Sequence, residues 1–209
     1  AVYEHLIRSE RLLDAGRNGS WDSVETVDHD MDGRDEVILE SNRANVYVSP
    51  ARGGAIFELD LKGPDWNVLG TMSRYEEAYH SDIPEDDGEE DGESASDVRS
   101  IHAGLTVKER GLARLAGSDG HPRWSAIEHL AGPDAEKQGR EWKKTEWERI
   151  ELGDLAWAPY EYSVSRREGA VGVTMRREGS ADEEGRRRPV GVRKNIWLAG
   201  DGTINVEYS

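Results

Sequence analysis

The stretch at residues 27–40 reads VDHDMDGRDEVILE and places three aspartates two positions apart. Asp28, Asp30 and Asp32 are followed directly by Gly33, and glycine permits the sharp bend that a tight loop requires. Calcium takes six to eight hard oxygen ligands at roughly 2.3–2.6 Å, and alternate side chains of such a loop converge on one point. We therefore expect this loop to bind Ca²⁺. The expected ligands are Asp28, Asp30, Asp32, the main-chain carbonyl of Arg34, and Glu36.

The loop differs from a helix-loop-helix calcium site at its twelfth position. That position requires a glutamate with two coordinating oxygens, but here it is Leu39, and residues 36–40 have the composition of a strand. The loop is therefore not an EF-hand. Sodium or magnesium in place of calcium stays open, and so does a solvated acidic turn without metal, because acid is abundant throughout the chain.

The composition is strongly acidic and poor in lysine. There are 43 Asp and Glu against 27 Lys and Arg, a formal net charge of −16, and the basic residues comprise 21 Arg and 6 Lys. We therefore expect a halophilic protein, because concentrated salt screens the repulsion among surface carboxylates. The charge argues against nucleic acid and anionic membranes as partners, since both bind basic patches.

Cysteine is absent from the 209 residues, which excludes disulfides, thiolate metal sites and cysteine nucleophiles. No apolar run approaches the ~20 residues of a membrane span, and the start of the sequence lacks the pattern of a signal peptide. We therefore expect a cytoplasmic protein, although a mature secreted form would have the same composition.

The elements that must position the acidic loop follow from the spacing of apolar residues. A short amphipathic helix is predicted within residues 1–20, with Tyr3, Leu6, Ile7 and Leu13 on one side. From residue 21 onward, alternation and short apolar runs predict strands. The predicted strands are EVILE, NVYVSP, AIFELDL, YEYSVS, AVGVTMR, VGVRKNIWL and TINVEYS.

One helix followed by many strands predicts a mainly β chain, with residues 21–209 folded as one antiparallel β-sandwich. Residues 82–98 are almost entirely polar and carry dense negative charge, so we expect a mobile acidic insertion there. The given sequence ends in a strand, TINVEYS, without a following turn. A further partner strand is therefore expected beyond that end or in another chain.

Longer motifs follow the pattern of a known family. In chain order they are YEHLIRSERLLD, NVYVSPARGGAIFELDLKGPDWNVLGTMSRYEEAYH, SIHAGLTVKERGL, SAIEHLAGPD, LGDLAWAPYEY and VRKNIWL. With these motifs the chain resembles the C-terminal β-sandwich region of glycoside hydrolase family 57, which contains α-amylases and 4-α-glucanotransferases. The acidic insertion after His80 is longer than usual, His102 is followed by Ala103 where the family has aspartate, and an aromatic stretch before SAIEHL is shortened.

The resemblance implies a galactose-mutarotase-like supersandwich, and it implies that catalysis lies elsewhere. In the family, the nucleophile and the general acid belong to an N-terminal (β/α) barrel, to which nothing in this sequence corresponds. Retaining glycoside cleavage needs two carboxyl groups about 5 Å apart, and the sequence nominates no such pair. We therefore expect no catalytic residues here, and we expect residues 1–20 to lead from the absent barrel.

Sugar contact is the second role that the resemblance implies, because the concave sheet of such a domain can present polar groups. Lys194 interrupts a strand face of Val192, Ile196 and Leu198, although its ammonium could instead extend from the sheet edge into solvent. The candidates for carbohydrate binding are Lys194, Arg52, Trp66 and His80.

Three hypotheses of function remain open at this point. The first is an accessory domain that packs against the catalytic barrel of an α-glucan-acting enzyme and is clamped by Ca²⁺ between its helix and its first strand. The second is a free-standing carbohydrate-binding or epimerase-like module. An accessory domain should expose an apolar patch, whereas a free-standing module should be polar outside its groove. The third, an isolated enzyme with a carboxylate pair, ranks last.

Overall fold

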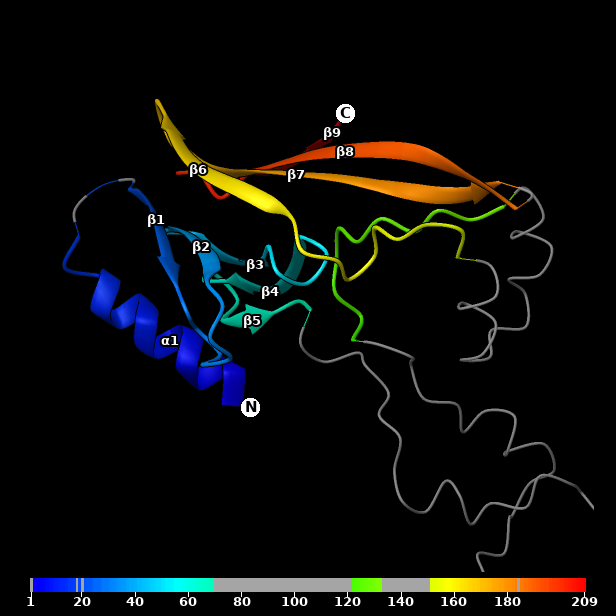
Figure 1. The fold of residues 1–209 in the computed structure, drawn as a ribbon. Coiled ribbons are helices and arrows are strands. Elements are labelled where there is room, and N and C mark those ends of the chain that lie inside the picture. Colours follow the sequence, from blue (N-terminus) through cyan, green and yellow to red (C-terminus); the bar gives the residue numbers. More distant parts are fainter. Residues whose placement is uncertain (1, 18, 20, 70–121, 133–150, 184) are drawn as a thin grey trace, which may run out of the picture.

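A computed structural model describes the whole chain except residues 1, 18, 20, 70–121, 133–150 and 184. The described residues form two stacked antiparallel sheets and one helix (Figure 1). We call the sheet with strand order β1-β2-β3-β4-β5 sheet A, and the sheet with order β6-β7-β8-β9 sheet B. The predicted mainly β fold with a short N-terminal helix is confirmed. The acidic stretch at 82–98 lies outside the described residues.

The elements have these bounds: α1 Val2–Asp14, β1 Asp22–Val27, β2 Glu36–Ser41, β3 Ala44–Ser49, β4 Ala55–Leu61, β5 Trp66–Asn67, β6 Glu161–Arg167, β7 Ala170–Glu183, β8 Arg186–Ala199 and β9 Ile204–Tyr208. All seven predicted strands are present. Two strands were missed: β1, whose sequence DSVETV does not alternate cleanly between apolar and polar residues, and β5, which has only two residues.

The hydrophobic core lies between the two sheets and follows the period of two that strands impose. Its fully buried members are Val37, Leu39, Ala44, Val46 and Val48 from sheet A and Val171, Val173, Met175, Ile196 and Leu198 from sheet B. One polar side chain belongs to the same inner face of β8, namely Lys194, which is 0% exposed.

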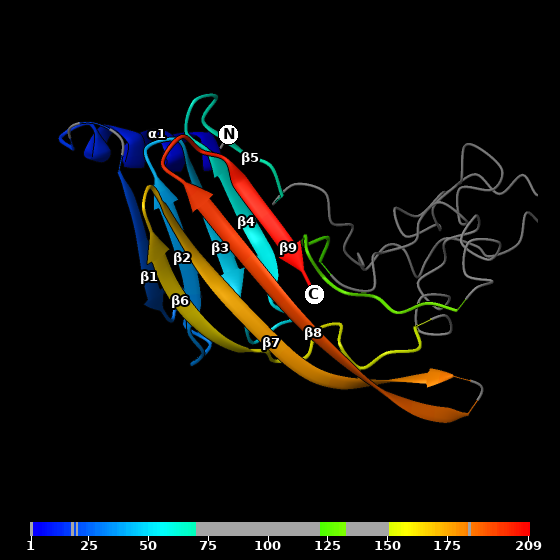
Figure 2. The ribbon, with the colours of Figure 1, turned by 90° about the horizontal axis from the view of Figure 1, so that it is seen from above.

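Strands β7 and β8 continue well past their predicted apolar runs. Their pairing extends to Glu183 and Arg186, so each strand has 14 residues, and the far part forms a polar ribbon beyond the sandwich (Figure 2). The segment before β6 is hydrogen-bonded to this ribbon, because the amide of Asp182 donates to the carbonyl of Leu152 at 2.7 Å. Backbone pairing, rather than apolar alternation, therefore sets the length of these strands.

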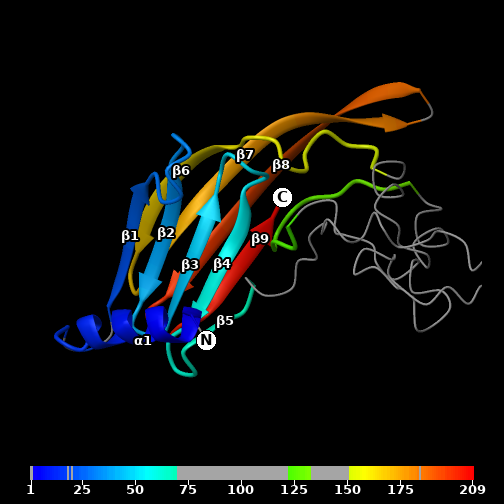
Figure 3. The same ribbon diagram turned by 90° about the horizontal axis from the view of Figure 1, so that it is seen from below.

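Helix α1 runs across one end of sheet A on the face that points away from sheet B (Figure 3). The predicted apolar side of the helix is divided, because Ile7 is 1% exposed whereas Leu6 is 60% and Leu13 is 82% exposed. In the described part of the chain, no helix has the length and apolar character that crossing a membrane requires.

Candidate functional site

The acidic loop connects β1 to β2, and it brings three of the predicted ligands together. Carboxylate oxygens of Asp28, Asp30 and Glu36 all lie within 4.8 Å of one another. Met31 and Gly33 adopt positive φ values of 60° and 85°, which turn the chain sharply between the first two ligands and the third. Oxygens at this spacing can reach one hard cation.

Backbone amides orient the carboxylates of this loop. The amide of Asp32 donates to Asp30 Oδ1 at 3.2 Å, and the amide of Gly33 donates to Asp28 Oδ2 at 3.0 Å. The other oxygen, Asp28 Oδ1, is buried and has no hydrogen-bond partner among the described residues. Buried polar atoms ordinarily have a partner, and a bound cation would provide one for this oxygen.

Glu36 is the buried member of the cluster, with 2% of its surface exposed. Burial raises the pKa of its carboxyl group, and the hydrogen bond from the His29 amide, 3.1 Å long, opposes that rise. Ser49 Oγ donates to the other carboxylate oxygen at 3.3 Å. A buried carboxylate is costly unless positive charge or donors surround it, and at this site a cation would supply that charge.

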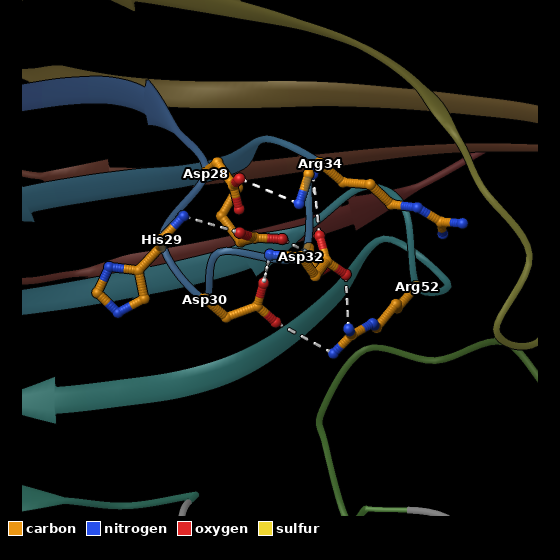
Figure 4. A network of polar contacts seen from close by, with 9 residues as sticks. Asp28, His29, Asp30, Asp32, Arg34 and Arg52 are labelled. Carbon is orange, nitrogen blue, oxygen red and sulfur yellow. Dashed lines mark hydrogen bonds and ion pairs between the residues drawn. The ribbon is translucent and has the colours of Figure 1, made fainter.

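Asp32 was predicted as a ligand, but its carboxylate points elsewhere in the structure. It accepts from Arg52 Nη2 at 2.6 Å and from the Arg34 amide at 2.9 Å, and Arg52 Nη1 also lies 3.3 Å from Asp30 Oδ2 (Figure 4). Arg52 therefore ties the acidic loop to the turn between β3 and β4. The expected clamp between helix and first strand is corrected as well, since the missed strand β1 precedes the loop.

Lys194 lies inside the sandwich rather than on an open face or at a sheet edge. Its Nζ is 2.6 Å from Glu128 Oε1, donates to the carbonyls of Gly53 and Gly54 at 3.0 Å each, and also contacts the Ala126 carbonyl. Burial lowers the pKa of the Lys194 ammonium, and the hydrogen bond to Glu128 opposes that fall. A sugar would have to displace these oxygens to reach the ammonium.

The turn beside Arg52 contains two glycines because its backbone lies close to Lys194 and Met175. Gly53 and Gly54 have φ values of 73° and 56°, and a Cβ on Gly54 would lie 2.9 Å from Met175 Sδ and 3.4 Å from Lys194 Nζ. Glycine is needed here because the backbone approaches sheet B closely. The turn connects the acidic loop, through Arg52, to the buried Lys194.

The predicted sugar contacts are not gathered at one described place. Lys194 is enclosed, Arg52 is bonded to the acidic loop, and His80 lies outside the described residues. Trp66 on β5 is 58% exposed, so its ring is available for stacking.

A second group of acids was not predicted. Glu58 and Asp60 share the outer face of β4, beneath the region that α1 crosses, and burial together with Glu58 raises the pKa of Asp60 to about 8. The two residues are two positions apart on the strand and face the buried layer under α1, where Asp60 is 3% exposed, so they do not form an open pair of the kind that retaining glycoside cleavage requires. The alternation of acids in FELD was the available signal, since it places both on one strand face.

Fold and loop together define a two-sheet antiparallel β-sandwich domain whose first hairpin carries clustered carboxylates. Residues 28–209 match the model of the family described as "Alpha-amylase/4-alpha-glucanotransferase, C-terminal". The chain belongs to this family, and the resemblance seen in the motifs is confirmed.

Individual relatives are α-amylases and 4-α-glucanotransferases, in agreement with the family match. Alpha-amylase 1 of Dictyoglomus thermophilum is 34% identical over 83% of this chain and 23% of its own length. The 4-alpha-glucanotransferase of Thermococcus kodakarensis is 31% identical over 100% of this chain and 28% of its own length. The crystal structure of 4-alpha-glucanotransferase from Thermococcus litoralis superposes with a TM-score of 0.70 at 26% identity, covering 99% of this chain and 28% of that one. The chain thus spans about a quarter of the length of these relatives.

Proposed function

We propose that this chain is the accessory β-sandwich of an enzyme acting on α-glucans, and that it packs against a separate catalytic domain. The relatives named above are α-amylases and 4-α-glucanotransferases, and the chain matches only 23% and 28% of the two curated ones. The remainder of such a protein is long enough to carry a catalytic domain.

The observation that carries this proposal is an apolar stripe on the outward side of α1. Val2, Leu6 and Leu13 are 72%, 60% and 82% exposed, and their spacing of four and seven residues places them on one side of the helix. Exposed apolar surface of this kind marks an interaction site. A free-standing module would not be expected to expose it outside a binding groove.

A chimera tests the docking of this stripe. The matching segment of the Thermococcus kodakarensis 4-alpha-glucanotransferase is replaced by this chain, with and without Leu6→Glu and Leu13→Glu. Because both side chains are exposed, the double variant should leave the melting temperature of the isolated chain nearly unchanged and lower that of the chimera. Leu12→Glu is the matched control, since Leu12 is 68% exposed but lies off the stripe. Equal effects in the isolated chain and the chimera would contradict docking.

The acidic loop has a structural role in this proposal, as a Ca²⁺ site formed by Asp28, Asp30 and Glu36. Support comes from their oxygens lying within 4.8 Å of one another and from the buried acceptor on Asp28. The cation would fasten the β1–β2 hairpin, and through Asp30 and Arg52 it would hold the turn that Lys194 anchors.

Direct contact with α-glucan is the second part of the proposal, and the exposed Trp66 supports it. Indole faces stack on the apolar face of a pyranose ring, and Trp66 is 58% exposed. Affinity electrophoresis of the isolated chain in gels containing amylopectin measures this binding. Retardation that Trp66→Ala removes supports the role; equal mobility with and without polysaccharide would restrict the domain to packing.

We also infer a cytoplasmic protein from a salt-rich environment. The net charge of −16 and the ratio of 21 Arg to 6 Lys support the salt-rich environment. A melting temperature that rises steadily into molar KCl would agree with it, whereas maximal stability at low salt would not.

A further inference from the structure

The face of sheet A beneath α1 carries a polar layer where a sheet facing a helix is usually apolar. One cross-strand row in this layer has the residues Glu40, Asn45, Asp60 and Asn67 directly opposite one another on β2, β3, β4 and β5. Asn45 is 0% and Asp60 is 3% exposed. The polar layer is therefore buried, and its charges must be compensated locally.

Helix α1 is attached to this layer by polar contacts. Asn45 Nδ2 donates to Glu10 Oε2 at 2.7 Å, and Lys62 Nζ lies 2.7 Å from Asp14 Oδ2. Ile7 adds one fully buried apolar side chain. The charge state of the layer therefore bears directly on whether α1 stays in place.

Acids outnumber bases around Asp60. The charged or titratable groups that face it or its immediate neighbours are Glu10, Arg11 and Asp14 from α1, His29 from the acidic loop, Glu40 from β2, Tyr47 from β3, Glu58 from β4, and Lys62 and Asp65 after β4. The nearest cations have partners of their own, since Lys62 is bonded to Asp14 and Arg11 to Asp65 at 3.0 Å. A proton on Asp60 is then the available way to reduce the negative charge.

The hydrogen-bond pattern agrees with a proton at this position. Burial raises the pKa of Asp60 to about 8, with repulsion from Glu58 and Glu10 adding to the rise and Lys62 opposing it. The hydrogen bond with Asp60 lowers the pKa of Glu58, as expected if the protonated Asp60 carboxyl donates and Glu58 accepts. Asp60 Oδ1 and Asn45 Oδ1 are buried without hydrogen-bond partners among the described residues, so a proton on Asp60 would reduce the uncompensated negative charge there.

We propose that Asp60 is a proton-dependent latch for helix α1. While Asp60 holds its proton, Glu10 and Asp14 dock the helix on Asn45 and Lys62. Loss of the proton puts a second negative charge beside Glu58, and the resulting repulsion beneath Glu10 and Glu40 releases the helix from the sheet. The latch acts within the domain and does not depend on the docking of α1 against a catalytic domain.

The absence of cysteine allows the helix position to be measured directly with two introduced labels. Leu13→Cys on α1, a position 82% exposed, and Glu25→Cys on the exposed part of β1 carry spin labels, and electron-electron distances are recorded at about pH 6 and about pH 9.5 in saturating Ca²⁺. We expect one narrow distance distribution at the lower pH and a broad, longer one at the higher pH. The midpoint should lie near the Asp60 pKa of about 8.

Asp60→Asn keeps the shape of the protonated carboxyl and cannot ionise, so it should give the narrow distribution at both pH values. Asp201→Asn, a change in the exposed β8–β9 turn, is the matched control and should leave the transition intact. Should Asp60→Asn not fold, the carboxyl carbon-13 shift of Asp60 is followed with pH in the otherwise unchanged chain. The midpoint of this titration should coincide with the midpoint of the distance change. A distance distribution independent of pH, a transition that persists in Asp60→Asn, or an Asp60 carboxyl that titrates near its ordinary value would each overturn the latch.

Discussion

Two groups of acids on sheet A, the acidic loop and the polar layer, differ in the hydrogen-bond donors that surround their carboxyl groups. In the acidic loop, the amides of His29, Asp32 and Gly33 each donate to a carboxylate. In the polar layer, Asp60 has only another carboxyl group, Glu58, as its described partner. The two groups therefore differ in the supply of hydrogen-bond donors, and this difference underlies our proposals of a cation for the acidic loop and a proton for the polar layer.

Glu128 shows a third arrangement, in which the positive charge is built into the chain. Lys194 Nζ lies 2.6 Å from Glu128 Oε1, and Tyr160 donates to Glu128 Oε2 at 2.7 Å. A buried ammonium and a hydroxyl group are thus the partners of this acid. It provides the reference against which the two acidic groups can be compared.

The largest effect is expected from removing that built-in charge. Lys194→Met removes the ammonium from Glu128 Oε1 and from the Gly53 and Gly54 carbonyls, and breaking a buried pair in this way costs about 3–5 kcal/mol. Urea unfolding of the variant measures the loss. Arg193→Met, at the neighbouring exposed position of β8, is the control and should change stability little. A Lys194→Met loss below that of the control would mean that the buried pair is not needed.

Calcium removal should have the next largest effect. A ligand present at 100 times its Kd stabilises the folded state by about 2.7 kcal/mol, which corresponds to roughly 5–10 °C in Tm for a domain of this size. Scanning calorimetry with and without chelator measures the shift. Asp30→Ala should abolish it, and Asp182→Ala, an acid on the β7–β8 ribbon, should not. A chelator that lowers both variants equally would point to a cation elsewhere.

The pH dependence of stability should distinguish the polar layer from the loop. The pKa of Asp60 is raised from 3.8 to about 8, so the folded state binds the proton more tightly than the unfolded chain does. The contribution of this proton to the free energy of unfolding is complete below about pH 4 and is lost as the pH rises through about 8. We expect a loss of roughly 2 kcal/mol, because release of α1 limits the repulsion. Urea unfolding across this range should show the decline, and Asp60→Asn should flatten it. A decline of equal size in Asp60→Asn would assign the titration to another group.

Trp66→Ala should have the smallest effect on stability, within about 0.5 kcal/mol, because exposed side chains contribute little. Its effect should appear only in binding of soluble maltodextrin, measured by titration calorimetry. Trp21→Ala is an informative comparison, since Lys62 Nζ lies 5.0 Å from the Trp21 ring and Arg17 lies 4.2 Å from it. A loss of stability in that variant without a loss of binding would separate the packing tryptophan from the exposed one.

The sequence predicted the strands that alternate and missed those that do not. Residues 36–40 and 170–176 show apolar runs or a period of two and were assigned correctly, because most of their side chains are buried. β1 is a half-buried edge strand of mixed composition, and its absence from the prediction placed the acidic loop directly after the helix. The error in one strand therefore changed which elements the loop was thought to connect.

The site residues divide according to how local their partners are. Asp28, Asp30 and Glu36 are close in sequence, and the turn at Gly33 was enough to predict that they converge. The partners of Arg52 and Lys194 are remote, since Lys194 reaches Gly53 across 141 residues, and no local pattern could reveal that enclosure. The same limit hid Asp60, because its raised pKa depends on burial and on Glu10 of α1 as well as on Glu58 of its own strand.

Calorimetric titration of Ca²⁺ into three chelator-treated proteins tests the contrast between the two acidic groups most directly. These are the unchanged chain, Asp30→Ala and Asp60→Asn. We predict a saturable one-site heat in the unchanged chain, its loss in Asp30→Ala and its retention in Asp60→Asn, since the loop acids would hold the cation and the layer acids a proton. No saturable heat in the unchanged chain, or a heat lost in Asp60→Asn and kept in Asp30→Ala, would contradict the account.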